Sequence, residues 1–175
     1  MSNHTILTIG AFLILTTVLL SLYRLLGTAG DDVGNAQDMI LATTLTTSYL
    51  ELAQGLAFDE RTDTSHVAVA SASTLTPVSW LGRDTSAENS IPAFNDFDDF
   101  NGFSIERAAT GSNKRFTTTF RVWYVDMNNV EHISAVPTFI KRMDVRTWRS
   151  FPLMTEGETP DTLRMSVCMG YFHYD

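Results

Sequence analysis

Hydrophobic residues dominate the start of the chain and predict a helix that is apolar on every side. Residues 5–26 read TILTIGAFLILTTVLLSLYRLL, with Arg24 as the only charged side chain. A bilayer core requires about 20 residues of apolar helix, and such a helix must be buried in lipid or among other helices. Small residues at 27–30 leave a cleaved secretory signal as the alternative. The positions expected to pack in a membrane or bundle core are Ile6, Ile9, Phe12, Leu13, Leu15, Leu19, Leu22 and Leu26.

A second helical pattern follows a segment that contains three glycines. Residues 27–35 read GTAGDDVGN, and each glycine weakens a helix by about 1 kcal/mol relative to alanine, so a bend or melted section is expected there. From residue 36 to 58, apolar side chains step by four, four, three and four residues, which places them on one helical face. The stripe expected to pack on a sheet consists of Leu41, Leu45, Tyr49, Leu52 and Leu56.

The remainder of the chain is predicted to be rich in β-structure. Residues 59–93 are rich in Ser, Thr, Ala and Asp and indicate a long irregular connection with one short strand. Four later stretches carry alternating, β-branched or aromatic residues, which are typical of strands. They cover 102–109, 115–126, 136–148 and 162–174. In the third, alternation places Lys141 on the same side as Met143 and Val145.

These elements predict an α+β fold. A long N-terminal helix, with an apolar half and an amphipathic half, would pack on a C-terminal antiparallel sheet of about four strands. The expected division is an apolar helix with its flexible segment at 1–35, an amphipathic half at 36–58 and a β-rich head at 59–175.

The stretch FNDFDDFNGF at 94–103 combines acidic and aromatic side chains. Hard cations such as calcium prefer several oxygen ligands, and the calcium candidates here are Asp96, Asp98, Asp99 and Asn101. The spacing of an EF-hand is absent, however, because the fifth and twelfth positions counted from Asp96 are Phe100 and Arg107. The favoured interpretation is structural. Phenylalanines at every third position would anchor the segment, while the aspartates would cap turns and face water.

Composition excludes several classes of function. The net charge is −8 and the only lysines are Lys114 and Lys141, so no contact with nucleic acid is expected. The four histidines lack the spacing of a metal site, and no nucleophile motif or phosphate loop is present, so neither enzymatic activity nor a cofactor is predicted. The single cysteine, Cys168, cannot form an internal disulfide and is expected to be a small buried hydrophobe.

The arrangement of these elements resembles type IV pilins and pseudopilins. The segments MSNHTILTIGAFLIL, AFDE, FNDFDDFNGF and the closing strands are similar to pilin-like proteins of Bacteroidota and Ignavibacteria-type bacteria. The resemblance implies a subunit that is stored in the inner membrane before it assembles with copies of itself into an extracellular filament. The helices would form the filament core, and the β-domains would face solvent.

The sequence departs from the pilin pattern at its start. Pilins carry glycine before the processing site, phenylalanine at the first mature position and glutamate at the fifth. Asn3, His4 and Thr8 occupy these positions here, so processing is expected to differ or not to occur. Two alternatives remain beside the filament subunit: a minor pseudopilin of a type II-like secretion system, and a membrane-anchored extracytoplasmic domain that binds calcium or acts as a sensor.

Overall fold

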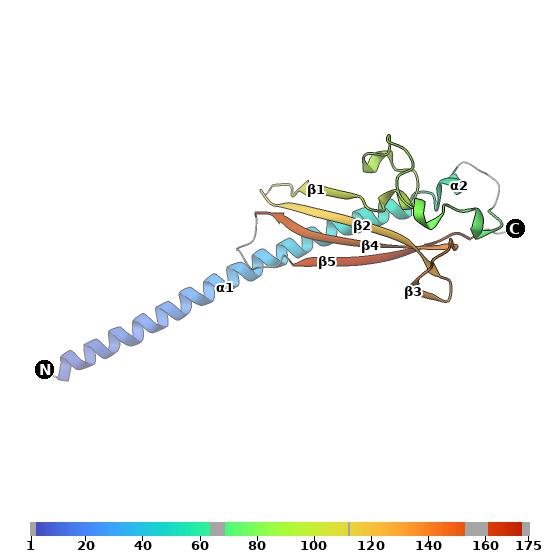
Figure 1. Cartoon of the computed structure of the whole chain (residues 1–175). Coiled ribbons are helices and arrows are strands. Elements are labelled where there is room, and N and C mark those ends of the chain that lie inside the picture. Colours follow the sequence, from blue (N-terminus) through green and yellow to red (C-terminus); the bar gives the residue numbers. More distant parts are fainter. Residues whose placement is uncertain (1–2, 64–68, 112, 153–160, 173–175) are drawn as a thin grey trace. The chain divides into compact units, whose positions relative to one another are not determined.

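The computed structural model describes residues 3–63, 69–111, 113–152 and 161–172 (Figure 1). The chain divides into two compact units, Met1–Ile40 and Leu41–Asp175. One helix, α1 (Asn3–Gln54), belongs to both units. The boundary between the units therefore falls within a helix, five residues beyond the predicted end of the apolar segment at residue 35.

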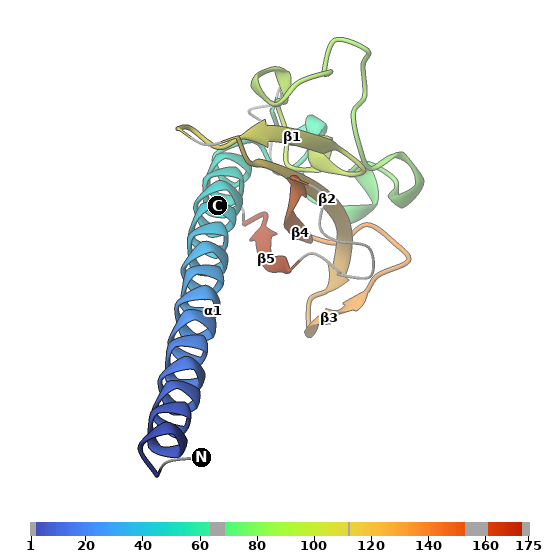
Figure 2. The ribbon, with the colours of Figure 1, turned by 90° about the vertical axis from the view of Figure 1, so that its left-hand side faces the viewer.

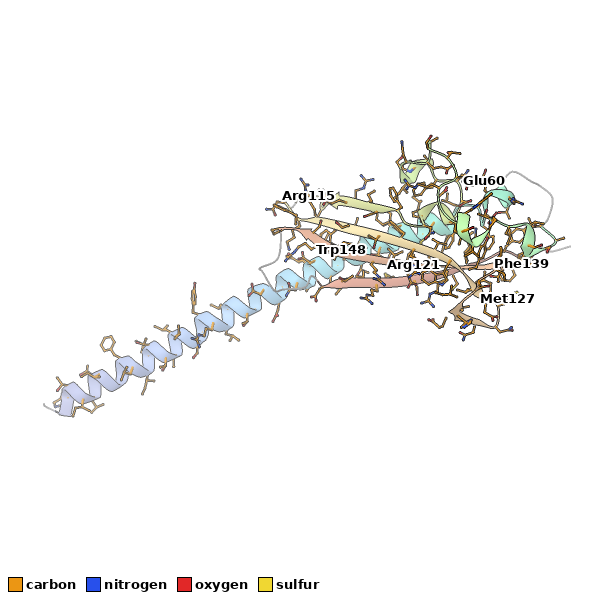
Figure 3. All side chains as sticks on the ribbon, in the orientation of Figure 1. Glu60, Arg115, Arg121, Met127, Phe139 and Trp148 are labelled. Carbon is orange, nitrogen blue, oxygen red and sulfur yellow. The ribbon has the colours of Figure 1, made fainter. Side chains whose placement is uncertain are left out.

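The first unit is the apolar part of α1, which is long and apolar enough to cross a membrane. Its large hydrophobic side chains project to all sides of the helix (Figure 3). The expected bend is wrong, because α1 is uninterrupted through Gly27, Gly30 and Gly34. Glycine lowers helix stability but keeps its backbone N–H, whereas proline, which breaks helices, does not occur in this segment.

The second unit contains an antiparallel sheet of five strands, which confirms the predicted α+β fold. The strand order is β1-β2-β4-β5, and β3 pairs with β2 outside this path (Figures 1 and 2). The strands are β1 (Ser104–Ala108), β2 (Arg115–Asp126), β3 (Asn129–Ile133), β4 (Ile140–Phe151) and β5 (Thr162–Gly170). The short helices are α2 (Glu60–Asp63), η1 (Ala72–Thr74), η2 (Val78–Trp80), η3 (Ile91–Ala93) and η4 (Asp98–Phe100).

The core of the second unit lies between one face of the sheet and the last turns of α1. Because side chains alternate along a strand, β2 and β4 each turn every second residue inward. Phe120 pairs with Val145 and Val122 with Met143, and all four side chains are buried. Leu50 and Ala53 of α1 belong to the same buried cluster. This packing holds the helix end against the sheet.

Two predictions about the strands need correction. Strand β3 was not expected, because all five of its residues are exposed and it carries no buried face for the pattern to reveal. The short strand expected within residues 59–93 is also absent from the described part of that segment, which forms α2 and η1–η3 instead. Residues 64–68, which include part of the candidate stretch HVAVA, lie outside the described residues.

The stripe of α1 that packs on the sheet is shifted from the predicted one. Leu41, Leu45, Tyr49 and Leu56 are partly buried against the core, but Leu52 is 43% exposed, so its predicted packing is wrong. The centre of the contact is formed by residues that the hydrophobic pattern ranked low or left out. They are Ala42, Thr46, Leu50 and Ala53, and all are buried. Small side chains allow the helix to approach the sheet closely, which a search for large hydrophobic residues cannot reveal.

A chain of three buried hydroxyl groups crosses this interface. Thr46 donates a hydrogen bond to the carbonyl oxygen of Ala42 at 2.7 Å, which uses its only hydroxyl hydrogen. The Thr147 hydroxyl, 2.7 Å away, must therefore donate to Thr46. By the same reasoning Thr118, at 3.0 Å, donates to Thr147. Each hydroxyl hydrogen thus has an acceptor without water.

We predict that Thr147→Val destabilises the head by about 1–2 kcal/mol, because the buried Thr118 hydroxyl loses its acceptor. For a chain of this size the midpoint of thermal unfolding should fall by about 4 °C, measured by circular dichroism on the full chain in detergent. Thr119→Val, a matched change on the opposite side of β2, should leave the midpoint nearly unchanged. Equal midpoints for the two variants would contradict the role of the hydroxyl chain.

Cys168 is exposed, so its expected burial is wrong. On β5 the partly buried hydrophobic side chains are those of Leu163, Met165, Val167 and Met169. Cys168 lies out of phase with them and pairs with Arg142 of β4, whose side chain also lies on the outer face. The apolar run around Cys168 suggested burial, but the alternation of the strand decides its side.

Candidate functional site: a buried lysine–aspartate cluster

The most unusual feature of the head is a lysine with no exposed surface. Lys141 lies on the inner face of β4, beside Met143, as the alternation predicts. Its Nζ donates hydrogen bonds to the Phe58 carbonyl oxygen and to Asp59 Oδ2, both at 2.8 Å, and a third to Asp98 Oδ1. The ammonium group therefore has three acceptors and no access to water. Burying a charge in this way is costly unless it is paired and hydrogen-bonded.

Aromatic rings enclose the ammonium group. Lys141 Nζ lies 4.7 Å from the centre of the Phe58 ring and 5.3 Å from that of the Tyr124 ring. Both residues belong to one buried cluster with Leu75. A cation over an aromatic face is stabilised by the ring quadrupole, and the rings also exclude water from the lysine.

Asp59 receives more hydrogen bonds than any other carboxylate of the cluster. Its oxygens accept from the Thr76 backbone N–H at 3.1 and 3.3 Å, from the Thr76 hydroxyl at 3.1 Å and from the Arg61 N–H at 3.2 Å. The Tyr124 hydroxyl, which has one hydrogen, lies 3.1 Å from Oδ2 and 2.9 Å from the Thr76 carbonyl oxygen, so these two acceptors share its hydrogen. Burial alone would raise the pKa of Asp59, but the charge of Lys141 and the hydrogen bonds from Lys141, Thr76 and Arg61 overcome it and lower the pKa. Asp59 is therefore the ionised partner of Lys141.

Asp98 has fewer donors, and its pKa is shifted in the opposite direction. Apart from Lys141, the one described residue that donates to it is Gly82, whose backbone N–H lies 3.3 Å from Oδ2. Burial raises the pKa of Asp98 and exceeds the opposing effect of Lys141, while the Asp59 charge raises it further. The two carboxyl groups around one lysine thus differ: Asp59 favours the charged form and Asp98 the acid form.

The segment that contains Asp98 folds as a tight turn, with its aspartates inside the protein. Asp96 Oδ1 accepts from the backbone N–H groups of Asp98 at 2.9 Å and Asp99 at 3.1 Å. Asp99 Oδ2 accepts from the N–H groups of Asn95 at 2.9 Å and Asp96 at 3.3 Å. The expectation that these aspartates face water is wrong, since all three are 1–2% exposed. Backbone donors and Lys141 replace the water that the sequence pattern implied.

The phenylalanines anchor this turn in the core. Phe94, Phe97 and Phe100 are buried, and Phe103 packs against them while partly exposed. The ring centres of Phe94 and Phe100 lie 4.9 Å apart in an edge-to-face contact, and Phe100 also contacts Phe120 of β2 at 5.1 Å. Gly102, with φ of 72°, adopts a backbone conformation that favours glycine as the chain turns into β1. The anchoring of the segment by its aromatic residues agrees with the structural interpretation.

The calcium candidates do not form one cation site. Asp98 pairs with Lys141, Asp99 caps the turn, and Asn101 bridges the Leu81 carbonyl oxygen and the Val122 N–H. Asp96 instead lies near two acidic residues from other segments, Glu60 and Asp84, with one oxygen from each within 4.8 Å of the others. Three carboxylates could contact a cation, but calcium takes six to eight oxygens.

The buried carboxyl groups predict a dependence of stability on pH. Burial raises the pKa of Asp96 from its ordinary 3.8 to about 8, and burial raises that of Asp99 to about 6. Between pH 4 and 8 the folded state therefore holds protons that the unfolded chain has lost, so stability falls as pH rises. The lowered pKa of Asp59 acts oppositely and only below about pH 4.

We expect the midpoint of thermal unfolding to fall by at least about 5 °C from pH 4.5 to 7.5. Asp96→Asn keeps an oxygen that can accept from the Asp98 and Asp99 N–H groups but cannot ionise, so it should flatten this slope. Glu106→Gln, an exposed carboxylate on β1, provides the control and should retain the slope. A flat profile in the unmodified chain would contradict the raised pKa of Asp96.

The sequence indicated some residues of this cluster but not that they lie together in the folded protein. Alternation placed Lys141 on the same side as Met143 and Val145, and the aspartates of 94–103 were singled out, whereas Asp59 and Tyr124 were missed as site residues. One feature of the sequence could have indicated these residues. A lysine on the same side of a strand as hydrophobic residues requires a buried acidic partner elsewhere in the chain. Comparisons with protein families, curated proteins and solved structures found no match to this chain.

Proposed function

We propose that this chain is a structural subunit of a pilus-like extracellular filament, held in the inner membrane by its apolar helix before it joins copies of itself. The observation that carries the proposal is the exposure of that helix. The eight positions assigned to the filament core, from Ile6 to Leu26, are each between 51% and 72% exposed. Apolar surface of this extent must be covered by something outside the chain, either lipid or other helices.

Three hydroxyl groups in the middle of the apolar helix form hydrogen bonds with its own backbone. Thr16 donates to the Phe12 carbonyl oxygen at 2.7 Å, and Ser21 donates to that of Thr17 at 2.8 Å. Thr17 in turn donates to the Ile14 carbonyl oxygen at 2.8 Å. Hydroxyl groups that bond to the helix backbone need no water, so they are compatible with lipid and with a packed bundle.

The part of the chain that the structure describes does not explain the glycines of the helix. A Cβ atom added at Gly10, Gly27, Gly30 or Gly34 would meet nothing within 4 Å, so no described neighbour requires a glycine there. Glycine in a helix interior costs about 1 kcal/mol relative to alanine. Close approach of a neighbouring helix would offset that cost, as in membrane bundles built on small residues. This favours association between copies over a helix surrounded only by lipid.

Shearing the cell surface tests the proposal. Filaments in the sheared fraction should be visible by negative-stain electron microscopy and should bind antibodies raised against the head. The number of copies per cell distinguishes a main subunit, present in thousands, from a minor pseudopilin. A chain that remains in the membrane as single copies, with no labelled filament, would refute the proposal.

A further inference from the structure

We propose that the head carries an internal isopeptide bond, an amide that joins Lys141 Nζ to the side-chain carbon Cγ of Asp98. The bond would form within the folded head, with Asp59 as the proton acceptor. It would link β4 to η4, two elements that are 43 positions apart at these residues. This inference does not depend on the filament, because every group involved belongs to a single head.

The three reacting groups are already assembled. Lys141 Nζ contacts Asp98 Oδ1 directly and lies 2.8 Å from Asp59 Oδ2. The side chains of Lys141 and Asp59 have no exposed surface, and that of Asp98 has 2%. The fold holds the amine against the carboxyl group, so the two groups need not meet by diffusion. Such fixed proximity accelerates reactions by large factors.

The surroundings favour the uncharged product over the ion pair. In water, an amine and a carboxylic acid remain separate because both ions are well hydrated and water opposes condensation. Here the rings of Phe58 and Tyr124 cover the amine, and burial imposes a desolvation cost on each ion. An amide carries no charge and removes that cost. The core that excludes water also gives the reverse reaction, hydrolysis, no ready supply of water.

The two aspartates hold the forms that the reaction requires. Attack by an amine needs a carboxyl group that can lose hydroxide as water, and Asp98, with few donors, favours the acid form. Removal of a proton from the ammonium group needs a nearby base, and Asp59 is held as a carboxylate by donors from Thr76 and Arg61. The different environments of these carboxyl groups separate the roles of electrophile and base.

The reaction balances without any other reagent. Asp59 takes one proton from the Lys141 ammonium group, and the neutral amine attacks Cγ of the Asp98 acid to form a C–N bond. The C–O bond to the Asp98 hydroxyl then breaks, and a second proton from nitrogen leaves with that hydroxyl as water. The third proton remains on the amide nitrogen, and Asp59 ends as a neutral acid that can donate to the new amide. One water molecule is the only product released.

Intact mass spectrometry of the full chain, purified in detergent, tests this bond. Most molecules should be lighter than the sequence mass by one water. Proteolysis should release a branched peptide in which the segment containing Lys141 is attached to the one containing Asp98. If the protein is folded by circular dichroism but has the full mass calculated from its sequence, the proposal is wrong. Loss of water without that branched peptide would also overturn it, because an aspartate can lose water by cyclising on its own backbone.

Matched variants assign the roles. Lys141→Arg keeps the positive charge but should retain the full mass, whereas Lys114→Arg, at the only other lysine, should lose water as the unmodified chain does. Asp59→Asn retains both reacting groups and should form the linked species about 100-fold more slowly, as expected for loss of a general base. If Asp59→Asn is linked as completely and as quickly as the unmodified chain, the assigned role of Asp59 is wrong.

Discussion

Replacing Lys141 with methionine is expected to lower the midpoint of thermal unfolding by about 10 °C. Methionine fills much of the same volume, so in chain that has not formed the proposed amide the main change is the loss of the ammonium group. Asp59 Oδ2, Asp98 Oδ1 and the Phe58 carbonyl oxygen then lose a donor inside the core. Removing one partner of a buried ion pair costs about 3–5 kcal/mol, since the other charge remains without compensation. For a chain of this length, that corresponds to a shift of roughly 10 °C.

Circular dichroism of the full chain in detergent provides the measurement, and Arg164→Met provides the control. Arg164 is an exposed basic residue on the neighbouring strand β5, so the same kind of change there should move the midpoint by about 1 °C or less. A shift of under about 3 °C in the Lys141 variant would show that the buried cluster contributes little to stability.

The double variant Lys141→Met with Asp59→Asn shows whether the two residues act together. It removes the Asp59 carboxylate, which would have no charged partner, as well as the lysine. Its loss of stability should therefore be smaller than the sum of the losses in the two single variants. Contacting residues in a single hydrogen-bonded network show coupling of about 0.5–3 kcal/mol. Strictly additive effects would indicate that Asp59 is not the ionised partner of Lys141.

Leu15→Glu is expected to reduce the yield of sheared filaments at least tenfold. Leu15 lies in the middle of the apolar part of α1 and is 54% exposed in the single chain. An acidic side chain at the centre of a membrane helix costs about 3 kcal/mol, and a similar cost applies in an apolar bundle without a partner charge. Since 1.4 kcal/mol corresponds to a factor of ten, assembly should be strongly disfavoured.

The control for this variant places the same charge on the head. Ser86→Glu introduces a glutamate at an exposed position outside the helix and should assemble at the normal yield. Immunoblots of the sheared fraction and of whole cells separate failed assembly from reduced synthesis. Normal filament yield from the Leu15 variant would mean that this part of α1 is not buried among copies of the chain.

Patterns within single elements could be predicted from the sequence. The alternation of β4 placed Lys141 on the same side as Met143 and Val145, and all three side chains are buried in the structure. These predictions hold because the two sides of a strand differ by one residue, so the periodicity decides burial locally. Strand β3 was not predicted because none of its residues is buried, so its sequence shows no alternation of hydrophobic and polar residues.

Contacts between distant segments could not be predicted. The aspartates of 94–103 were expected in water because isolated carboxylates are rarely buried. The structure buries Asp98 against a lysine 43 positions away, a pairing that no local spacing encodes. The helix stripe was misplaced by about one position for a similar reason. Thr46 has no apolar signal, and only the facing Thr147 on β4 explains its burial.

Electron cryo-microscopy of filaments sheared from cells that produce this chain tests the central claim, that the apolar part of α1 is buried among copies of itself. The map should contain a core of packed helices, with side-chain density that fits residues 6–26 of neighbouring copies and with the β-heads on the outside. The account would be contradicted if the chain is found only as single molecules, or if the filament core is built from another protein.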